Sequence, residues 1–460
     1  MKTMKNIKRK NNNKENSMFH LTWPIFLQSI LTMLVGNVDQ YMVANYSENA
    51  VGAISNANQI INLLLISFTI ISVATTILVS QYIGAKNTEK LSTIYSLSLA
   101  VNLIFSLTIA AVIFFFSGPI LTFMSLPDVL FADASTYIKL VGGFIFLQGL
   151  ITTFSAILRA NKMMKENLIV SVVINVFNVI FNAILISGLG PIPALGVAGA
   201  AMATIISRLG GLLIYIVIFI RKFDTRISLK YIIPFPKEEF KKMLSIGVPS
   251  AGESISYSLA MTFITKIVNM IGLVHGTYII NTRAFAKTFS WVSFLYASAV
   301  GQASQVVIGN YMGAEDTEEV DKLVKRTLRN AVIIGLGISL ILFTFSDFLF
   351  GLFSTDPRVL ELGKKIMFIE VFLELGKCTN ITLVRSLQAT GDVKFPTMIG
   401  IISMWTIAVG VGYILGVKLG LGLIGIWIGM TLDEDIRGVI FMIRWKKGGW
   451  KDIRLVENKN

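Results

Sequence analysis

One carboxylate, Asp39, interrupts the first long apolar stretch of the chain, residues 21–44. An acidic side chain near the middle of a bilayer costs about 2.5–3.5 kcal/mol on insertion scales, so such a group generally faces a cavity or a partner. Pro24 lies upstream in the same stretch, and a proline inside a helix removes a backbone hydrogen bond and permits a bend. These residues predict a moving helix with one titratable group. The alternative is that Pro24 starts the helix and Asp39 makes a static hydrogen bond.

Two carboxamides, Asn178 and Asn182, are four residues apart in a later apolar stretch and therefore share one helix face. Asn175 precedes Asn178 by one helical turn and is a candidate third member. Carboxamides hydrogen-bond a protonated or ionised carboxyl group, and their oxygens also suit Na⁺. The alternative is ordinary interhelical hydrogen bonding, worth less than about 1 kcal/mol for each bond.

The second half of the chain contains more charged residues within its apolar stretches. Unpaired, such groups are too costly to keep in lipid, so they must face a cavity or form a buried network. We expect Glu253, Glu370 and Glu374 to contribute to a substrate or cation site, although Lys377 is placed to pair with Glu374. We expect the remaining charged residues to form a structural network or a cytoplasmic gate, in which the bases neutralise the acids: Asp433, Glu434, Asp435, Arg437, Lys266, Arg283 and Lys287.

The elements that carry these residues are predicted to be membrane-spanning helices. Of 460 residues, 54% are hydrophobic and 15% are charged, whereas a soluble domain has about 25% charged residues. The apolar residues form blocks of about 20 or more, which is typical of a polytopic helical membrane protein. The expected spans are 19–44, 51–83, 91–117, 130–158, 166–187, 195–220, 243–271, 276–311, 327–353, 359–388, 395–417 and 422–443.

The net charge of +14 follows a topological pattern. Basic residues gather before the first span and in alternate connections, with Lys418 and the group Arg358, Lys364 and Lys365 as exceptions. This positive-inside pattern predicts a multi-pass plasma-membrane protein with both termini in the cytoplasm. The charge therefore indicates the bilayer as a partner and argues against nucleic acid.

The chain divides into five predicted segments. They are a disordered cytoplasmic N-terminus at 1–17, a six-span lobe at 18–220, a cytoplasmic linker at 221–242, a second six-span lobe at 243–443 and a cytoplasmic tail at 444–460. The fold class is accordingly all-α, with twelve transmembrane helices in two pseudo-symmetric six-helix bundles.

The two lobes repeat one another in sequence. Residues 81–89, QYIGAKNTE, match residues 310–318, NYMGAEDTE, at an offset of 229 (310 − 81). Residues 158–160 match 387–389 at the same offset, and 196–199 match 422–425 at 226. Because the offset covers an even number of spans, we expect the halves to share one orientation, related by an axis along the membrane normal.

From about residue 21 to residue 450 the sequence resembles the multidrug and toxic compound extrusion (MATE) family of transporters. The resembling segments are QYIGA, NYMGA, LGVAGAAMATIISR at 195–208 and ELGKCTNITLVRSLQATGDVKFP at 374–396, followed by SMW, LGLGLIGIWI, DEDIRG and RWKKGGW, which are similar to a bacterial subgroup. The resemblance implies two helix bundles forming a V around a cavity that opens alternately to each side. It also implies export of an organic, often cationic, compound in exchange for H⁺ or Na⁺.

The resemblance also suggests roles for individual residues. Asp39 matches the coupling acid of span 1, Pro24 matches a proline at which that helix bends in some members, and Thr204 matches a threonine of the same ion site. Asn178 and Asn182 match a polar pair whose second member is often aspartate. Asn182 is therefore a departure, which removes one negative charge and weakens the case for a two-aspartate site.

Other chemistries find little support in the sequence. There is no P-loop and no recognisable catalytic set, so we expect neither ATP hydrolysis nor another enzyme activity. Cys378 is the single cysteine, and His20 and His275 form no ligand motif. We expect no cofactor beyond the coupling ion, no metal beyond a possible Na⁺ at Asp39, and a monomer.

Two rival functions remain open. A flippase for lipid-linked precursors more often has extra spans and a strongly cationic cavity, whereas here the intramembrane acids about balance the bases. A membrane-embedded enzyme or receptor lacks support, because the chain has no catalytic cluster and no sizeable soluble domain. The balance of charge favours a small organic cation as the exported substrate.

Overall fold

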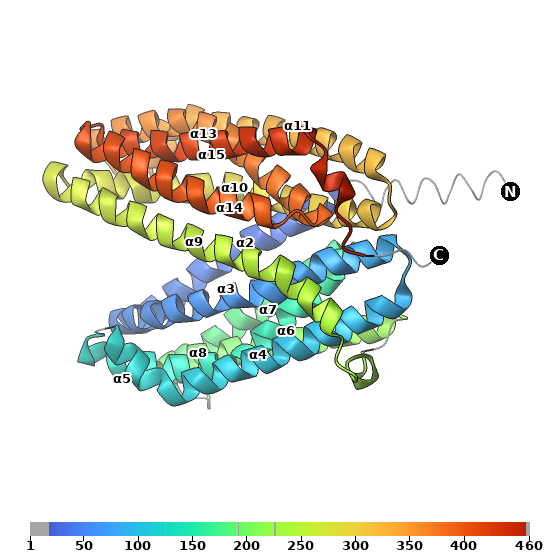
Figure 1. The fold of residues 1–460 in the computed structure, drawn as a ribbon. Coiled ribbons are helices and arrows are strands. Elements are labelled where there is room, and N and C mark those ends of the chain that lie inside the picture. Colours follow the sequence, from blue (N-terminus) through green and yellow to red (C-terminus); the bar gives the residue numbers. More distant parts are fainter. Residues whose placement is uncertain (1–17, 125, 192, 225–226, 457–460) are drawn as a thin grey trace. The chain divides into compact units, whose positions relative to one another are not determined.

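The computed structural model describes residues 18–124, 126–191, 193–224 and 227–456 (Figure 1). These residues form long helices joined by short connections, with no β-strand among them. The predicted all-α architecture is therefore confirmed. The expected terminal segment at 1–17 lies outside the described residues.

The first six expected spans each coincide with helical structure. The fourth is bent by 43° between residues 128–142 and 145–160, next to a π-helical turn. The elements are α2 (Met18–Tyr46), α3 (Glu48–Gly84), α4 (Thr88–Phe123), α5 (Asp128–Tyr137) with η1 (Ile138–Gly142) and α6 (Ile145–Ala160), α7 (Met164–Ser187) and α8 (Gly196–Lys222).

The second six spans are also helical. The seventh begins earlier than expected, because the amphipathic run after Pro236 joins it without a break. The elements are α9 (Lys237–His275), α10 (Tyr278–Gly313), α11 (Thr317–Thr344) with α12 (Ser346–Gly351), α13 (Pro357–Thr390), α14 (Lys394–Ser403) with η3 (Met404–Val411) and η4 (Ile414–Lys418), and α15 (Gly422–Lys446). Two short 3₁₀ turns, η2 (Leu229–Tyr231) and η5 (Gly449–Asp452), lie outside the spans.

Most of these helices have the length and composition of membrane spans. Among the described residues, nine helices, or ten if the bent pair counts as one span, are long and apolar enough to cross a bilayer. The helices α13 and α15 are 34 and 25 residues long but carry clusters of charged residues. Their charges are the ones that the sequence singles out as costly in lipid.

The internal repeat extends to the backbone. Asn87 and Asp316, which are 229 positions apart, both cap a helix by accepting a hydrogen bond from the amide three residues later. The residues just before them, Lys86 and Glu315, both adopt a positive φ, of 55° and 59°. The matched segments therefore fold alike, which supports a duplicated unit.

Glycine contacts are repeated in the same way. A Cβ on Gly199 of α8 would collide with the Leu185 carbonyl group of α7, and one on Gly425 of α15 would lie 2.5 Å from the Leu415 carbonyl carbon. Small residues allow two helix backbones to approach closely. The contact between spans 5 and 6 therefore recurs between spans 11 and 12.

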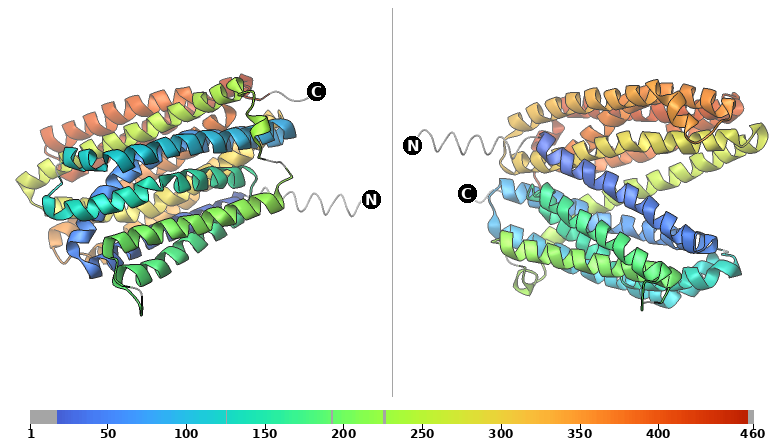
Figure 2. Two further views of the ribbon diagram at one scale, coloured as in Figure 1. Left: turned by 90° about the horizontal axis from the view of Figure 1, so that it is seen from below. Right: turned by 180° about the vertical axis from the view of Figure 1, so that it is seen from behind.

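The chain separates into two compact units, within each of which helices lie side by side (Figures 1 and 2). The N-unit is residues 27–247, and the described part of the C-unit is residues 18–26 and 248–456. Each unit has its own apolar core, around Ile61 and Phe68 in the N-unit and around Phe350 and Ile366 in the C-unit. The start of α2 thus belongs to the C-unit, although the sequence placed it in the first lobe.

Both helices that run from one unit into the other contain a proline near the boundary. The boundary in α2 follows Phe26, two residues after Pro24, and the boundary in α9 follows Gly247, two residues before Pro249. The predicted linker, 221–242, contains η2 and the first turn of α9, where Glu239 forms an ion pair with Lys90 of α4.

Candidate functional site

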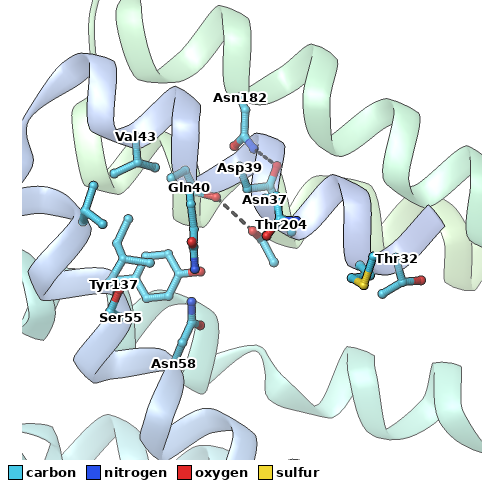
Figure 3. A pocket seen from close by; sticks show the side chains of 15 residues that line it. Thr32, Asn37, Asp39, Gln40, Val43, Ser55, Asn58, Tyr137, Asn182 and Thr204 are labelled. Atoms are coloured by element: carbon cyan, nitrogen blue, oxygen red, sulfur yellow. Dashed lines mark hydrogen bonds between the residues drawn. The ribbon is translucent and has the colours of Figure 1, made fainter. Parts of the chain in front are cut away.

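The Asp39 side chain lines a cavity of about 330 Å³ inside the N-unit (Figure 3). The walls come from α2, α3, α7, α8 and the end of α5. Their polar lining, besides Asp39 and Asn182, is Thr32, Asn37, Gln40, Ser55, Asn58, Tyr137 and Thr204. The half-buried acid therefore faces a polar space among the helices.

Two carboxamides hold the Asp39 carboxylate. The Asn182 amide nitrogen donates to Asp39 Oδ1 at 2.8 Å. The Asn178 amide is oriented with its nitrogen 3.0 and 2.9 Å from the two Asp39 oxygens, since the opposite orientation would set oxygen against oxygen. Thr204 Oγ1 lies 3.5 Å from the Asn178 side chain and donates to the Ala200 carbonyl. The structure thus gathers the four predicted ion-coupling residues around one carboxylate.

Helix geometry explains this arrangement. Asn178 and Asn182 are one turn apart on α7, and both are buried. The close contact at Gly199 brings α8, and with it Thr204, against α7. Asn175, the candidate third member, does not line the cavity, and its buried side-chain nitrogen has no hydrogen-bond partner among the described residues.

The cluster of side chains around Asp39 includes an oxygen that accepts no hydrogen bond from a described residue. Asn182 Oδ1 is buried and has no hydrogen-bond partner among the described residues. A carboxylate, a free amide oxygen and a hydroxyl oxygen form a donor set suited to Na⁺, and the carboxylate alone accepts a proton. Within the described part of the chain, no cluster of three or more His, Cys, Asp or Glu residues could hold a metal ion.

Sequence reasoning missed two residues near this site. Tyr137, at the junction of α5 and η1, lines the cavity and interacts with Asn58 and Thr204. Arg208 lies one turn after Thr204 on α8, in the neighbourhood of Tyr137. An arginine inside an apolar span is itself a signal of function, so Arg208, the last residue of segment 195–208, is identifiable as a candidate from the sequence.

In the C-unit, Lys377 joins two buried acids of α13. Its amino group lies 2.8 Å from Glu370 Oε1 and 2.9 Å from Glu374 Oε2. The other oxygens also accept hydrogen bonds, from Trp427 Nε1 to Glu370 at 2.8 Å and from Cys378 Sγ to Glu374 at 3.1 Å. The pairing of Glu374 with Lys377, which the sequence left open as an alternative, is present.

A second network surrounds Arg437 on α15. Its guanidinium group forms ion pairs with Asp433 and, at 2.8 Å, with Glu434. Ser403 donates to the remaining oxygen of Asp433, and Asn380 donates to the remaining oxygen of Glu434. The pairing that the sequence suggested for Asp433 and Arg437 is therefore present.

Lys266, Arg283 and Lys287 were expected to neutralise these acids. This expectation is wrong with respect to ion pairs, because these bases form none with the acids in the described chain. Arg283 donates to Thr265 Oγ1 at 2.9 Å, and none of the three bases pairs with an acid of the described chain. Lys377 and Arg437 take that role because they lie on the same helices as the acids, at spacings that bring side chains together.

Two further predicted residues are placed as follows. Glu253 of α9 is half-buried, lies beside Gly400 of α14 and has no hydrogen bond to a described residue. Pro24 lies inside the continuous helix α2, which extends back to Met18. The alternative that Pro24 starts this helix is therefore wrong.

Comparison with known proteins identifies relatives along nearly the whole chain. The MatE family model matches residues 24–184 and 249–414. The chain is 36% identical over 437 residues to "Uncharacterized transporter YisQ" of Bacillus subtilis, covering 95% of each chain. It is 26% identical over 448 residues to "Probable multidrug resistance protein NorM" of Thermotoga maritima, covering 94% of this chain and 92% of that one.

A solved structure shares the fold. It is described as the outward-facing conformation of a multidrug resistance MATE family transporter of the MOP superfamily. The TM-score is 0.85 at 19% identity, and the match covers 95% of this chain and 96% of the other. At that identity the likeness concerns the fold.

Proposed function

The chain belongs to the MATE (MatE) family of efflux transporters, and we propose that it is a secondary antiporter that exports organic, mainly cationic, compounds in exchange for H⁺ or Na⁺. Its relatives include proteins named for multidrug resistance. The observation that carries the proposal is the Asp39 carboxylate, held by Asn178 and Asn182 beside a cavity, with Asn182 Oδ1 left without a partner in the described chain.

The chemistry of this group supports exchange. The two amide nitrogens stabilise an ionised carboxylate by charge-assisted hydrogen bonds. A proton on Asp39 removes the charge that these donors serve, and a Na⁺ ion would bind the carboxylate, Asn182 Oδ1 and Thr204 Oγ1. Either cation therefore favours a different arrangement of α2, α7 and α8 from the one that the empty carboxylate favours.

Energy for export comes from the cation gradient. One positive charge that moves inward through 100 mV supplies about 2.3 kcal/mol, and a concentration gradient adds to this. Coupling requires only that the cation and the exported compound bind the two conformations with different affinities. Antiport follows if occupancy of Asp39 favours the conformation that binds the compound less tightly.

The prolines provide a route for the motion. In both helices that pass between the units, the boundary lies next to a proline, Pro24 or Pro249. A proline leaves one carbonyl group of the preceding turn without its helical partner and lowers the cost of bending there. We propose that α2 and α9 bend at these positions during alternating access.

We also propose a membrane topology, an oligomeric state and a set of ligands for the protein. Both termini lie in the cytoplasm, the protein acts as a monomer, and the coupling ion is its only required cofactor. The chain binds neither ATP nor nucleic acid. The charge pattern of the connections supports the orientation.

Efflux in proteoliposomes tests the proposal. A fluorescent organic cation is loaded inside, and H⁺ and Na⁺ gradients are imposed independently. We expect Asp39→Asn to lower gradient-driven efflux by about two orders of magnitude, since the amide can neither ionise nor accept a proton. Asp128→Asn, at the exposed start of α5, is the matched control and retains efflux. Undiminished gradient-driven efflux by Asp39→Asn would refute the role of Asp39.

A further inference from the structure

A second cavity, of about 110 Å³, lies inside the C-unit among α9, α10, α13 and α15. One face of α10 contributes Arg283, Lys287, Ser290, Trp291 and Phe294, at the three- and four-residue spacings of a helix stripe. Pockets for whole drug-sized ligands are about 300–1,000 Å³. This cavity therefore fits a single chemical group of a larger molecule.

The acids that line or adjoin this cavity have no free oxygen. Glu370 and Glu374 each use both carboxylate oxygens in hydrogen bonds, and both contact Lys377. Asp433 and Glu434 likewise use all of their oxygens, and both contact Arg437. A cation entering the cavity would have to break this network before a carboxylate could bind it.

The bases of α10, in contrast, have free donors. A guanidinium group has five N–H donors and an ammonium group has three. Arg283 uses one donor to bind Thr265 at 2.9 Å, and Lys287 makes no hydrogen bond or ion pair with the described residues. Ser290, three residues after Lys287, has a buried hydroxyl group without a partner in the described chain.

This arrangement places two like charges side by side. Arg283 and Lys287 are four residues apart on one helix, where like charges repel each other. Charged groups inside a membrane span are normally paired or face a water-filled space. An anion between them would remove the repulsion and accept charge-assisted hydrogen bonds from both side chains.

We propose that this cavity binds the anionic group of an aromatic or lipid-like amphiphile: a carboxylate, phosphate or sulfonate held by Arg283 and Lys287. The Ser290 hydroxyl group donates a third hydrogen bond. Trp291 and Phe294, whose ring centroids are 4.7 Å apart, contact the adjoining apolar part. If that ligand is a substrate, which rests on the function proposed above, the exported compounds include anions or zwitterions as well as cations.

Equilibrium binding to the purified full-length protein tests the site without any ion gradient. The probes are 2-naphthoate, the matched cation 2-naphthylmethylamine, and dioctanoyl phosphatidic acid as a lipid phosphate. We expect Arg283→Gln combined with Lys287→Gln to weaken naphthoate binding by about tenfold or more, because charge-assisted hydrogen bonds are lost. Lys266→Gln, a lysine of α9 that does not line the cavity, is the control and leaves binding unchanged.

The outcomes separate the alternatives. Unchanged naphthoate affinity in the double variant overturns the proposal. The proposal is also overturned if the wild-type protein binds the amine more tightly than naphthoate and the double variant loses this amine binding. Competition by phosphatidic acid at lower concentration than naphthoate assigns the anion to a lipid phosphate. If the melting curve shows that the double variant is unfolded, Lys287→Gln alone decides, since that side chain is exposed.

The test is independent of the proposed antiport. Asp39→Asn lies in the other unit and should bind naphthoate with wild-type affinity. Loss of efflux with intact naphthoate binding leaves the anion site standing. Intact efflux with no naphthoate binding removes the anion site and leaves the antiporter standing.

Discussion

At the scale of single residues, Asp39 depends on the two amide groups that face it. Asn182 donates one hydrogen bond to the carboxylate, and its side-chain oxygen accepts none from any residue that the structure describes. Under the proposed exchange, Asn182 therefore serves both the empty and the cation-bound state. Aspartate at this position would have added a second charge, whereas asparagine supplies a donor and a ligand oxygen without one.

We expect Asn182→Leu to lower gradient-driven efflux by about tenfold or more, because the carboxylate loses a charge-assisted hydrogen bond worth about 1.5–3 kcal/mol and a cation loses one ligand. The measurement is initial efflux rate in proteoliposomes against the imposed gradient. Asn175→Leu is the matched control on the same helix. Its side-chain nitrogen is buried and has no partner among the residues described, so this replacement should preserve the efflux rate and raise the melting temperature slightly. Equal rates for the two variants would contradict the role of Asn182.

The limits of sequence reasoning are clearest for charged residues. The spacing of Glu374 and Lys377 allowed an ion pair within one helix, because neighbours at three and four residues meet on its surface. Pairing between helices depends on helix rotation, which spacing does not specify. For that reason Arg283 and Lys287 were expected to neutralise acids that Lys377 and Arg437 neutralise in the structure.

At the scale of elements, α2 and α9 differ from the other helices because each passes from one unit into the other as a continuous helix. Each runs unbroken through a proline, and each changes unit within two or three residues of it. For α2 the sequence predicted a bendable helix from Pro24 and its apolar surroundings, but not the change of unit. Pro249 does not stand out in the sequence, because its meaning depends on the division into units, which long-range packing sets.

We expect Pro249→Ala to slow efflux several-fold while leaving the fold intact. Alanine restores the backbone donor to Ser245 and removes a helix penalty of about 3 kcal/mol, so bending of α9 becomes more costly. Pro119→Ala provides the control, since α4 stays within the N-unit. Transport and thermal unfolding should be measured on both variants. Faster or unchanged efflux by Pro249→Ala, with the control also unchanged, would show that α9 does not bend there.

At the scale of the whole molecule, the sequence predicted the twelve helical spans and the duplication. Apolar blocks and repeated motifs are local signals, and the matching helix caps and positive-φ residues at Lys86 and Glu315 come from the same motifs. The cavities were not predictable in this way. Tyr137, which lines the Asp39 cavity, directly precedes a π-helical turn in a span that is bent by 43°, and neither feature has a reliable sequence pattern.

The central claim for the molecule is that cation occupancy at Asp39 and binding of the exported compound are linked. Thermodynamic linkage is reciprocal, so the compound must displace the cation to the same degree that the cation displaces the compound. The direct measurement is release of H⁺ or Na⁺ when tetraphenylphosphonium is added to the purified protein in weakly buffered solution. We predict cation release from the wild-type protein and none from Asp39→Asn at matched occupancy of tetraphenylphosphonium. Equal release from both proteins would contradict the account.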